Sequence, residues 1–70
     1  MATNIRAIRK SKGMTQGDLA LAARINRVTI AKYETGKITP TLTNAGKIAT
    51  ALGVTVNDLI AEAADETSND

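Results

Sequence analysis

The 70-residue sequence contains no cysteine, histidine, tryptophan or phenylalanine. Disulfides, thiolate metal sites and imidazole acid–base chemistry are therefore excluded, and no cofactor is expected. Tyr33 is the single aromatic residue, so the core must be aliphatic, which argues against a stacking platform for single-stranded nucleic acid. No apolar run approaches the ~20 residues of a membrane span. The apolar region of a signal peptide, about 7–15 residues long, is also lacking, so a cytoplasmic protein with no membrane partner is the default expectation.

Charges of both signs are present, and they are unevenly distributed. Residues 1–37 have a net charge of +6 and residues 38–70 a net charge of −4, which together give the +2 of the chain. This segregation favours a basic surface that faces a polyanion on one side of the protein. Ordinary scatter of charges in a small protein is the alternative.

The apolar residues have helical spacing, and no stretch alternates for long enough to form a strand. We therefore predict an all-α domain over residues 1–64, followed by an acidic C-terminal tail, residues 65–70, that frays. Five helices are expected, at residues 4–12, 16–23, 27–35, 42–52 and 56–64. Their spacing predicts this buried set: Ile5, Ile8, Met14, Leu19, Ala20, Ala23, Ile25, Ile30, Tyr33, Leu42, Ala45, Ile48, Ala49, Leu52, Val56, Leu59 and Ile60.

The expected helix starts carry clear local signals. Thr15 with Asp18, and Thr55 with Asp58, have the spacing of a capping box, in which each residue satisfies a backbone N–H of the other. Asn26 has a side chain that can cap the third helix.

The expected helix ends are marked by glycine, and the entry to the fourth helix by Pro40. Either Thr41 or Thr39 caps that helix, and we prefer Thr41. The glycines that close the helices before them are Gly13, Gly36 and Gly53.

An ordered set of residues runs through most of the chain: Arg9, Lys12-Gly13-Met14-Thr15-Gln16, Leu19-Ala20, Ile25-Asn26-Arg27, Thr29-Ile30, Tyr33-Glu34, Gly36-Lys37, Pro40, Lys47-Ile48-Ala49, Ala51-Leu52-Gly53-Val54 and Asp58-Leu59. This set resembles the lambda-repressor-like (Xre-type) helix-turn-helix proteins over about residues 4–62. The resemblance implies five helices, with a helix-turn-helix formed by the second and third. It also implies binding of operator DNA, usually as a two-fold dimer, to regulate transcription.

The outward face of the third helix is expected to read DNA bases, because it points away from the side that Ile30 and Tyr33 turn to the core. It carries Arg27, Val28, Ala31 and Lys32. A bidentate contact of Arg27 with guanine and packing of Val28 on a thymine methyl would give sequence preference, and Lys32 is expected to reach a base or a phosphate. A merely solvated surface is the alternative for each of them.

Phosphate contacts are expected beside this face. Gln16 would offer its amide and the free N–H groups at the start of the second helix, and Lys37 would bind past the end of the third. The hydroxyl contacts are assigned to Thr15, Thr35 and Thr39. The resemblance further implies a partly buried structural ion pair between Arg9 and Glu34, for which a solvated surface pair is the alternative.

Three residues depart from the family pattern. Arg24 stands in the turn, where the family usually has glycine, so the turn either keeps a left-handed conformation at a cost or is reshaped. Gly46 replaces a large aliphatic residue and suggests either a groove or a close helix approach. Gly17 replaces an acidic residue, which removes a negative charge near the expected phosphates.

We therefore expect a sequence-specific regulator, of repressor or controller type, that binds a palindromic double-stranded DNA operator as a homodimer. The dimer is assigned to the fifth helix and preceding loop, through Ile60, Ala61, Ala64 or Ile38. No small-molecule effector is evident. A helical protein-interaction module that does not bind DNA is the alternative; an enzyme is not expected, because no nucleophile–base pair is visible. Phage, restriction-modification and antitoxin contexts all stay open.

Overall fold

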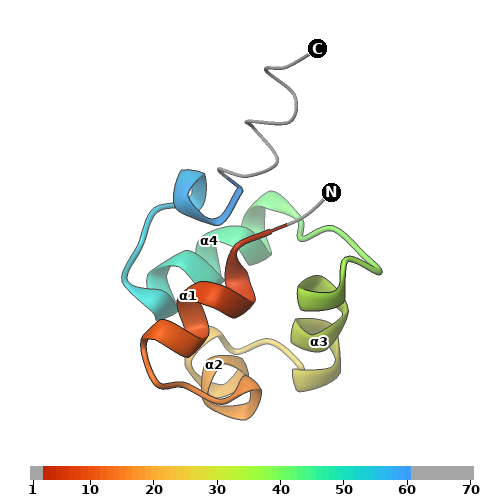
Figure 1. Ribbon diagram of the computed structural model, residues 1–70. Helices are drawn as coiled ribbons and strands as arrows, with labels where there is room; N and C mark the ends of the chain where they lie inside the picture. Colours follow the sequence, from red (N-terminus) through yellow and green to blue (C-terminus); the bar gives the residue numbers. More distant parts are fainter. Residues whose placement is uncertain (1–2, 61–70) are drawn as a thin grey trace.

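Residues 3–60 are described by the computed structural model, and they form an all-helical domain without strands in that range. The helices are α1 (Ile5–Ser11), α2 (Gln16–Ala23), α3 (Arg27–Thr35) and α4 (Leu42–Leu52). A fifth helix begins at residue 56 and is described to residue 60. α2 packs against α3 and α4, and α1 packs against the same two helices (Figure 1). The five-helix prediction is confirmed, whereas the expected helix end at residue 64 and the tail at 65–70 lie outside the described residues.

The predicted caps are present at four helix starts. In the box that opens α2, Thr15 Oγ1 accepts from the Asp18 N–H at 3.0 Å and Asp18 Oδ2 accepts from the Thr15 N–H at 2.9 Å. Thr55 and Asp58 exchange the same two bonds before the fifth helix. Hydrogen bonding of the Asp58 carboxylate to the backbone N–H of Thr55, and also to its hydroxyl, holds the pKa of Asp58 below its usual range. The local signal was sufficient here because both partners lie within one turn.

The caps of α3 and α4 are single side chains. Asn26 Oδ1 accepts from the Val28 N–H at 2.8 Å, which begins α3. Thr41 Oγ1 accepts from the Asn44 N–H at 3.1 Å, so Thr41 rather than Thr39 caps α4.

The first helix is shorter than the expected range of 4–12. Asn4 lies at its N-cap position, but its side chain does not cap it. Instead, Asn4 Nδ2 donates to the carbonyl of Asp58 at 3.0 Å, and the Asn4 N–H donates to the carbonyl of Leu59 at 2.9 Å. These bonds join the start of α1 to the fifth helix, a long-range contact that no local pattern contains.

Each of the five helices contributes one large, fully buried aliphatic side chain to the core. These residues are Ile5, Leu19, Ile30, Ile48 and Leu59. Alanines fill the narrow spaces between α2 and its neighbours, with Ala20 and Ala23 8% and 4% exposed. The expectation for Leu42 was wrong, since it is 80% exposed. Leu42 continues the apolar stripe of α4, but as the first residue of that helix it extends past the core.

Gly46 borders a groove rather than a close helix contact. A Cβ built at Gly46 would meet no atom within 4 Å outside its own helix. The shallow hollow beside it is lined by Ala22, Ala23, Arg24, Lys47 and Thr50.

Candidate nucleic-acid interface

The turn between α2 and α3 determines the orientation of α3 relative to α2. Arg24 ends α2 with φ 58° and ψ 45°, so the turn keeps the left-handed conformation. The Ile25 N–H donates to the Ala20 carbonyl at 3.0 Å, and the Arg24 N–H donates to the Leu21 carbonyl at 3.3 Å. Ile25 packs its half-buried side chain against the core. The backbone of the turn is therefore hydrogen-bonded, although its central residue is not glycine.

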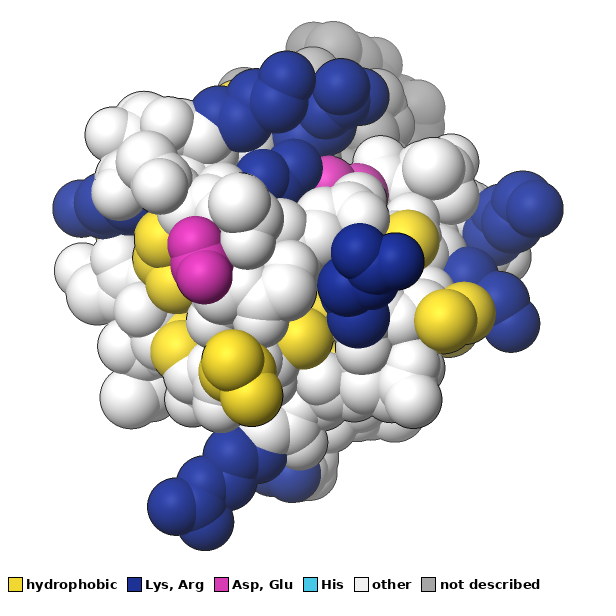
Figure 2. All heavy atoms as spheres, turned by 90° about the horizontal axis from the view of Figure 1, so that it is seen from below, with side chains coloured by type: hydrophobic (Ala, Val, Ile, Leu, Met, Phe, Trp, Pro, Cys, Tyr) yellow, Lys and Arg dark blue, Asp and Glu magenta, His cyan; other side chains and the backbone are white. Residues whose placement is uncertain are grey.

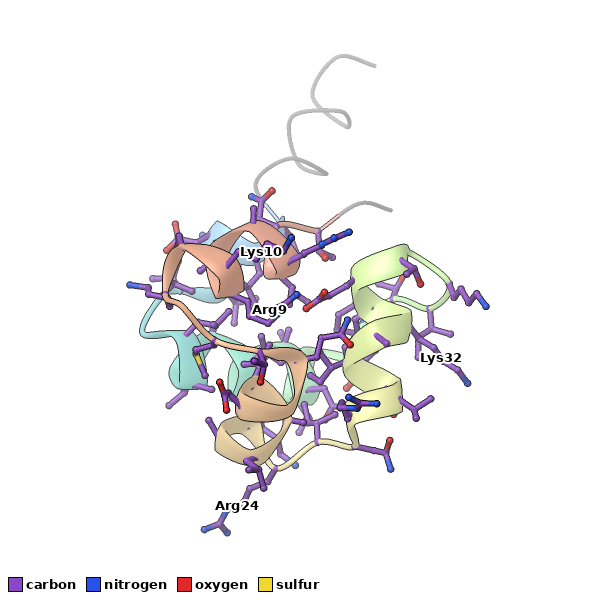
Figure 3. All side chains as sticks on the ribbon, turned by 60° about the horizontal axis from the view of Figure 1, so that its bottom comes forward. Arg9, Lys10, Arg24 and Lys32 are labelled. Carbon is purple, nitrogen blue, oxygen red and sulfur yellow. The ribbon has the colours of Figure 1, made fainter. Side chains whose placement is uncertain are left out.

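α3 has one buried and one exposed face. Ile30 is 0% exposed and Tyr33 is 4% exposed. The Tyr33 hydroxyl accepts from Asn44 Nδ2 at 2.8 Å, so this tyrosine joins α3 to α4 inside the domain. On the outer side Arg27, Val28 and Lys32 are exposed, and Ala31 is half-buried. Lys32 points away from α1 and α2 (Figure 3).

The face that carries α2 and α3 is rich in cations. Seen from that side, Lys and Arg side chains are spread over the surface and around its rim, whereas acidic side chains are few (Figure 2). Val28 adds an aliphatic side chain that is 60% exposed. The combination of cations and an exposed aliphatic group suits contact with DNA phosphates and with base edges.

Arg9 and Glu34 form a buried ion pair that ties α1 to the end of α3. Arg9 Nε donates to Glu34 Oε2 at 2.7 Å and Arg9 Nη2 donates to Oε1 at 3.1 Å. The two side chains are 9% and 2% exposed. Arg9 Nη1 also donates to the Met14 carbonyl at 2.7 Å, and Gln16 Nε2 donates to Glu34 Oε1 at 3.2 Å. One carboxylate therefore joins α1, α2 and α3.

The pKa of Glu34 reflects two opposing effects. Burial raises it, but the hydrogen bonds from Arg9 and Gln16 and the positive charges of Arg9 and Arg6 outweigh burial, so the pKa lies below its usual range. The hydrogen bond to Glu34 in turn raises the pKa of the Arg9 guanidinium. Glu34 is thus held ionised at neutral pH.

The residues expected at phosphates are only partly free. Gln16 is half-buried and engages Glu34, which leaves its carbonyl oxygen and one amide hydrogen. Thr15 is exposed, and its hydroxyl accepts from Asp18, so the hydroxyl hydrogen can still be donated. The Thr35 hydroxyl donates back to the Ala31 and Lys32 carbonyls at 3.1 and 3.3 Å. These contacts of Gln16 and Thr35 had no sequence signal.

Lys37 and Thr39 are exposed in the segment between α3 and α4. The sequence also missed the Met14 carbonyl as a partner of Arg9, since a backbone acceptor leaves no trace in residue type.

Among residues 3–60 no group of three acidic side chains is placed to hold a metal ion. Within the same range, no helix has the length and apolarity that crossing a membrane requires.

The fold and the exposed α3 face define the class of helix-turn-helix DNA-binding proteins. Residues 5–59 match the family described as Helix-turn-helix. The chain therefore belongs to the lambda-repressor-like (Xre-type) helix-turn-helix family, and it is a transcriptional regulator with a DNA-binding fold.

Relatives of known sequence support this membership. An uncharacterized HTH-type transcriptional regulator from Archaeoglobus fulgidus is 42% identical over 59 residues, 84% of each chain. Another such regulator, from Methanothermobacter thermautotrophicus, is 45% identical over 53 residues, 76% of this chain and 77% of that one. The immunity repressor protein of Bacillus phage phi105 is 36% identical over 58 residues, which are 83% of this chain but 40% of the phage protein.

Two solved structures share the arrangement of helices. The restriction-modification controller protein C.AhdI from Aeromonas hydrophila superposes with a TM-score of 0.76 and 31% identity, over 79% of this chain and 83% of that one. The clp gene regulator ClgR from C. glutamicum has a TM-score of 0.79 and 31% identity, over 89% of this chain and 80% of that one.

Proposed function

We propose that this regulator is of repressor or controller type and binds a palindromic double-stranded operator as a homodimer, with α3 in the major groove. The observation that carries the proposal is the exposed outer face of α3, where Arg27, Val28 and Lys32 lie opposite the buried Ile30 and Tyr33. Arg27 and Val28 contact base edges, and Lys32 contacts a base or a phosphate. Ala31 lets the helix approach closely between them.

Phosphate contacts fix the position of α3 on the duplex. Gln16 contributes its remaining amide hydrogen and Lys37 its ammonium group, with weaker contributions from the hydroxyls of Thr15 and Thr39. Thr35 contributes only if its hydroxyl leaves the α3 backbone, so it is the weakest member of this set.

We assign the homodimer contact to the fifth helix and the loop preceding it; Ile38, a further apolar candidate, lies in the loop between α3 and α4. Ile38 is 43% exposed and Leu42, four residues further on, is 80% exposed, which supports a partner surface there. Ile60 is half-buried. Ala61 and Ala64, which were assigned to the same contact, lie outside the described residues. The substitution Ile38→Glu should shift the dimer toward monomer in sedimentation equilibrium.

Selection of bound sequences from random duplexes tests the operator directly. We expect an inverted repeat whose half-site centres are ~34 Å apart, one helical turn of DNA. A single asymmetric site would contradict the homodimer, and the absence of any enriched sequence would contradict specific binding and favour a protein-interaction module. In the same selection, Arg27→Ala should lose preference at one base pair of each half-site, by ~1–3 kcal/mol.

A further inference from the structure

We infer that Gly17 determines the base specificity of Arg27, because the missing side chain at position 17 leaves the Arg27 guanidinium without a carboxylate partner. Gly17 is the second residue of α2, and Arg27 is the first residue of α3. The inference rests on the proposed function, since it concerns how one base-reading side chain is kept available.

Gly17 lies directly beside the side chain of Arg27. A Cβ built at Gly17 would be 3.9 Å from Arg27 Cδ and 3.7 Å from Thr15 Oγ1, both ordinary van der Waals distances. Gly17 and Arg27 also line the same shallow hollow between the starts of α2 and α3, together with Thr15 and Asp18. A glutamate at position 17 would therefore be long enough to reach the Arg27 guanidinium.

The guanidinium of Arg27 is free in the part of the chain that the structure describes. Among residues 3–60, the only ion pair within 4.0 Å is the one between Arg9 and Glu34. The side chain of Arg27 makes no hydrogen bond in this range. Asp18 lines the same hollow, but its Oδ2 is engaged by the Thr15 N–H in the capping box. Arg9 differs from Arg27, because its guanidinium is bound by a carboxylate at 2.7 Å and is held within the domain.

The stability of α2 does not explain why position 17 is glycine. Position 17 is in the first turn, where an acidic side chain is favoured by the helix dipole and where glycine is a poor helix former. An added Cβ would meet no prohibitive contact. The charge of an acidic side chain would stabilise the helix, but its carboxylate would pair with Arg27 and withdraw it from DNA.

A double-mutant cycle on the selected operator tests this mechanism. Dissociation constants are measured by fluorescence anisotropy on the operator and on a duplex changed at the base pair where Arg27→Ala loses preference. The variants are Gly17→Ala, Gly17→Gln and Gly17→Glu, each with Arg27 and with Arg27→Ala. Circular dichroism establishes that every variant is folded.

The wild type and Gly17→Ala should discriminate between the two duplexes by about 5- to 150-fold. Gly17→Glu should lose most of this discrimination between the two duplexes. Gly17→Gln, the neutral control of equal length, should reduce it less. In the Arg27→Ala background Gly17→Glu should have no further effect on the ratio.

Equal weakening of both duplexes by Gly17→Glu, or the same effect with and without Arg27, would overturn the inference, because the carboxylate would then act on the phosphates. Failure of the proposed function looks different. In that case the wild type itself does not discriminate, or Arg27→Ala loses no preference, and Arg27 has no base contact for Gly17 to protect.

Discussion

Replacement of Arg24 by glycine tests whether the turn between α2 and α3 stores backbone strain. Arg24 is the one non-glycine residue with positive φ among residues 3–60, at φ 58° and ψ 45°. An L-residue in this region costs roughly 1–2 kcal/mol, and glycine adopts it without that cost. Glycine also loses about 0.4–1 kcal/mol more conformational entropy on folding. Taken at their central values, about 1.5 and about 0.7 kcal/mol, these two effects give an expected net gain in the free energy of unfolding of about 0.5–1 kcal/mol.

The side chain of Arg24 offers little to offset this gain. It is exposed, and in Figure 3 it points away from the body of the domain. The two hydrogen bonds of the turn involve backbone atoms only, so they survive the substitution. In a domain of this size ~1 kcal/mol corresponds to about 4–8 °C, which predicts that Tm rises by roughly 2–8 °C.

Thermal unfolding followed by circular dichroism measures this shift. Arg24→Ala is the matched control, because it removes the charge and keeps an L-residue at the left-handed position. We expect its Tm to stay near that of the wild type. An unchanged or lower Tm for Arg24→Gly would refute the strain argument, and an equal rise in both variants would assign the gain to relief of charge repulsion.

Two further predictions concern the ion pair and the phosphate contacts. Glu34→Gln should cost about 3 kcal/mol at pH 7, since it leaves Arg9 buried without a carboxylate. Because the folded-state pKa of Glu34 is lowered, its contribution is complete above its unfolded pKa of about 4.3 and is lost as the pH falls through the folded value. The Tm difference between wild type and variant should thus shrink in acid, and a constant difference would contradict the argument. Lys37→Ala should reduce the log–log salt slope of duplex binding by ~1, whereas Lys47→Ala, on α4, should not; equal effects would place Lys37 off the interface.

The helix starts could be predicted from the sequence wherever both hydrogen-bonding partners lie within one turn. Thr15, Asn26 and Thr41 all cap as expected. The start of α1 could not, because Asn4 bonds to residues 58 and 59, more than fifty positions away. Leu42 failed for a related reason: periodicity gives the direction of a side chain but not where the core ends.

The candidate site shows the same division. The periodicity of Ile30 and Tyr33 was sufficient to predict which face of α3 is exposed. It could not predict that Gln16 would engage Glu34 or that Thr35 would bond to its own helix, since either side chain is equally able to face solvent. Residue type therefore lists the groups that can contact a phosphate, and the tertiary structure decides which hydrogens are left for it.

The backbone strain at Arg24 lowers the stability of the domain, but it does not set the angle between α2 and α3. The left-handed turn is held by backbone hydrogen bonds, and the far end of α3 is held by Glu34 through Arg9 and Gln16. Glycine fits the φ and ψ values that Arg24 already has, so its substitution leaves the angle between α2 and α3 unchanged. We therefore expect Arg24→Gly to keep the wild-type base preference while its Tm rises. A changed preference would mean that the arginine side chain, and not only the backbone, sets the position of α3.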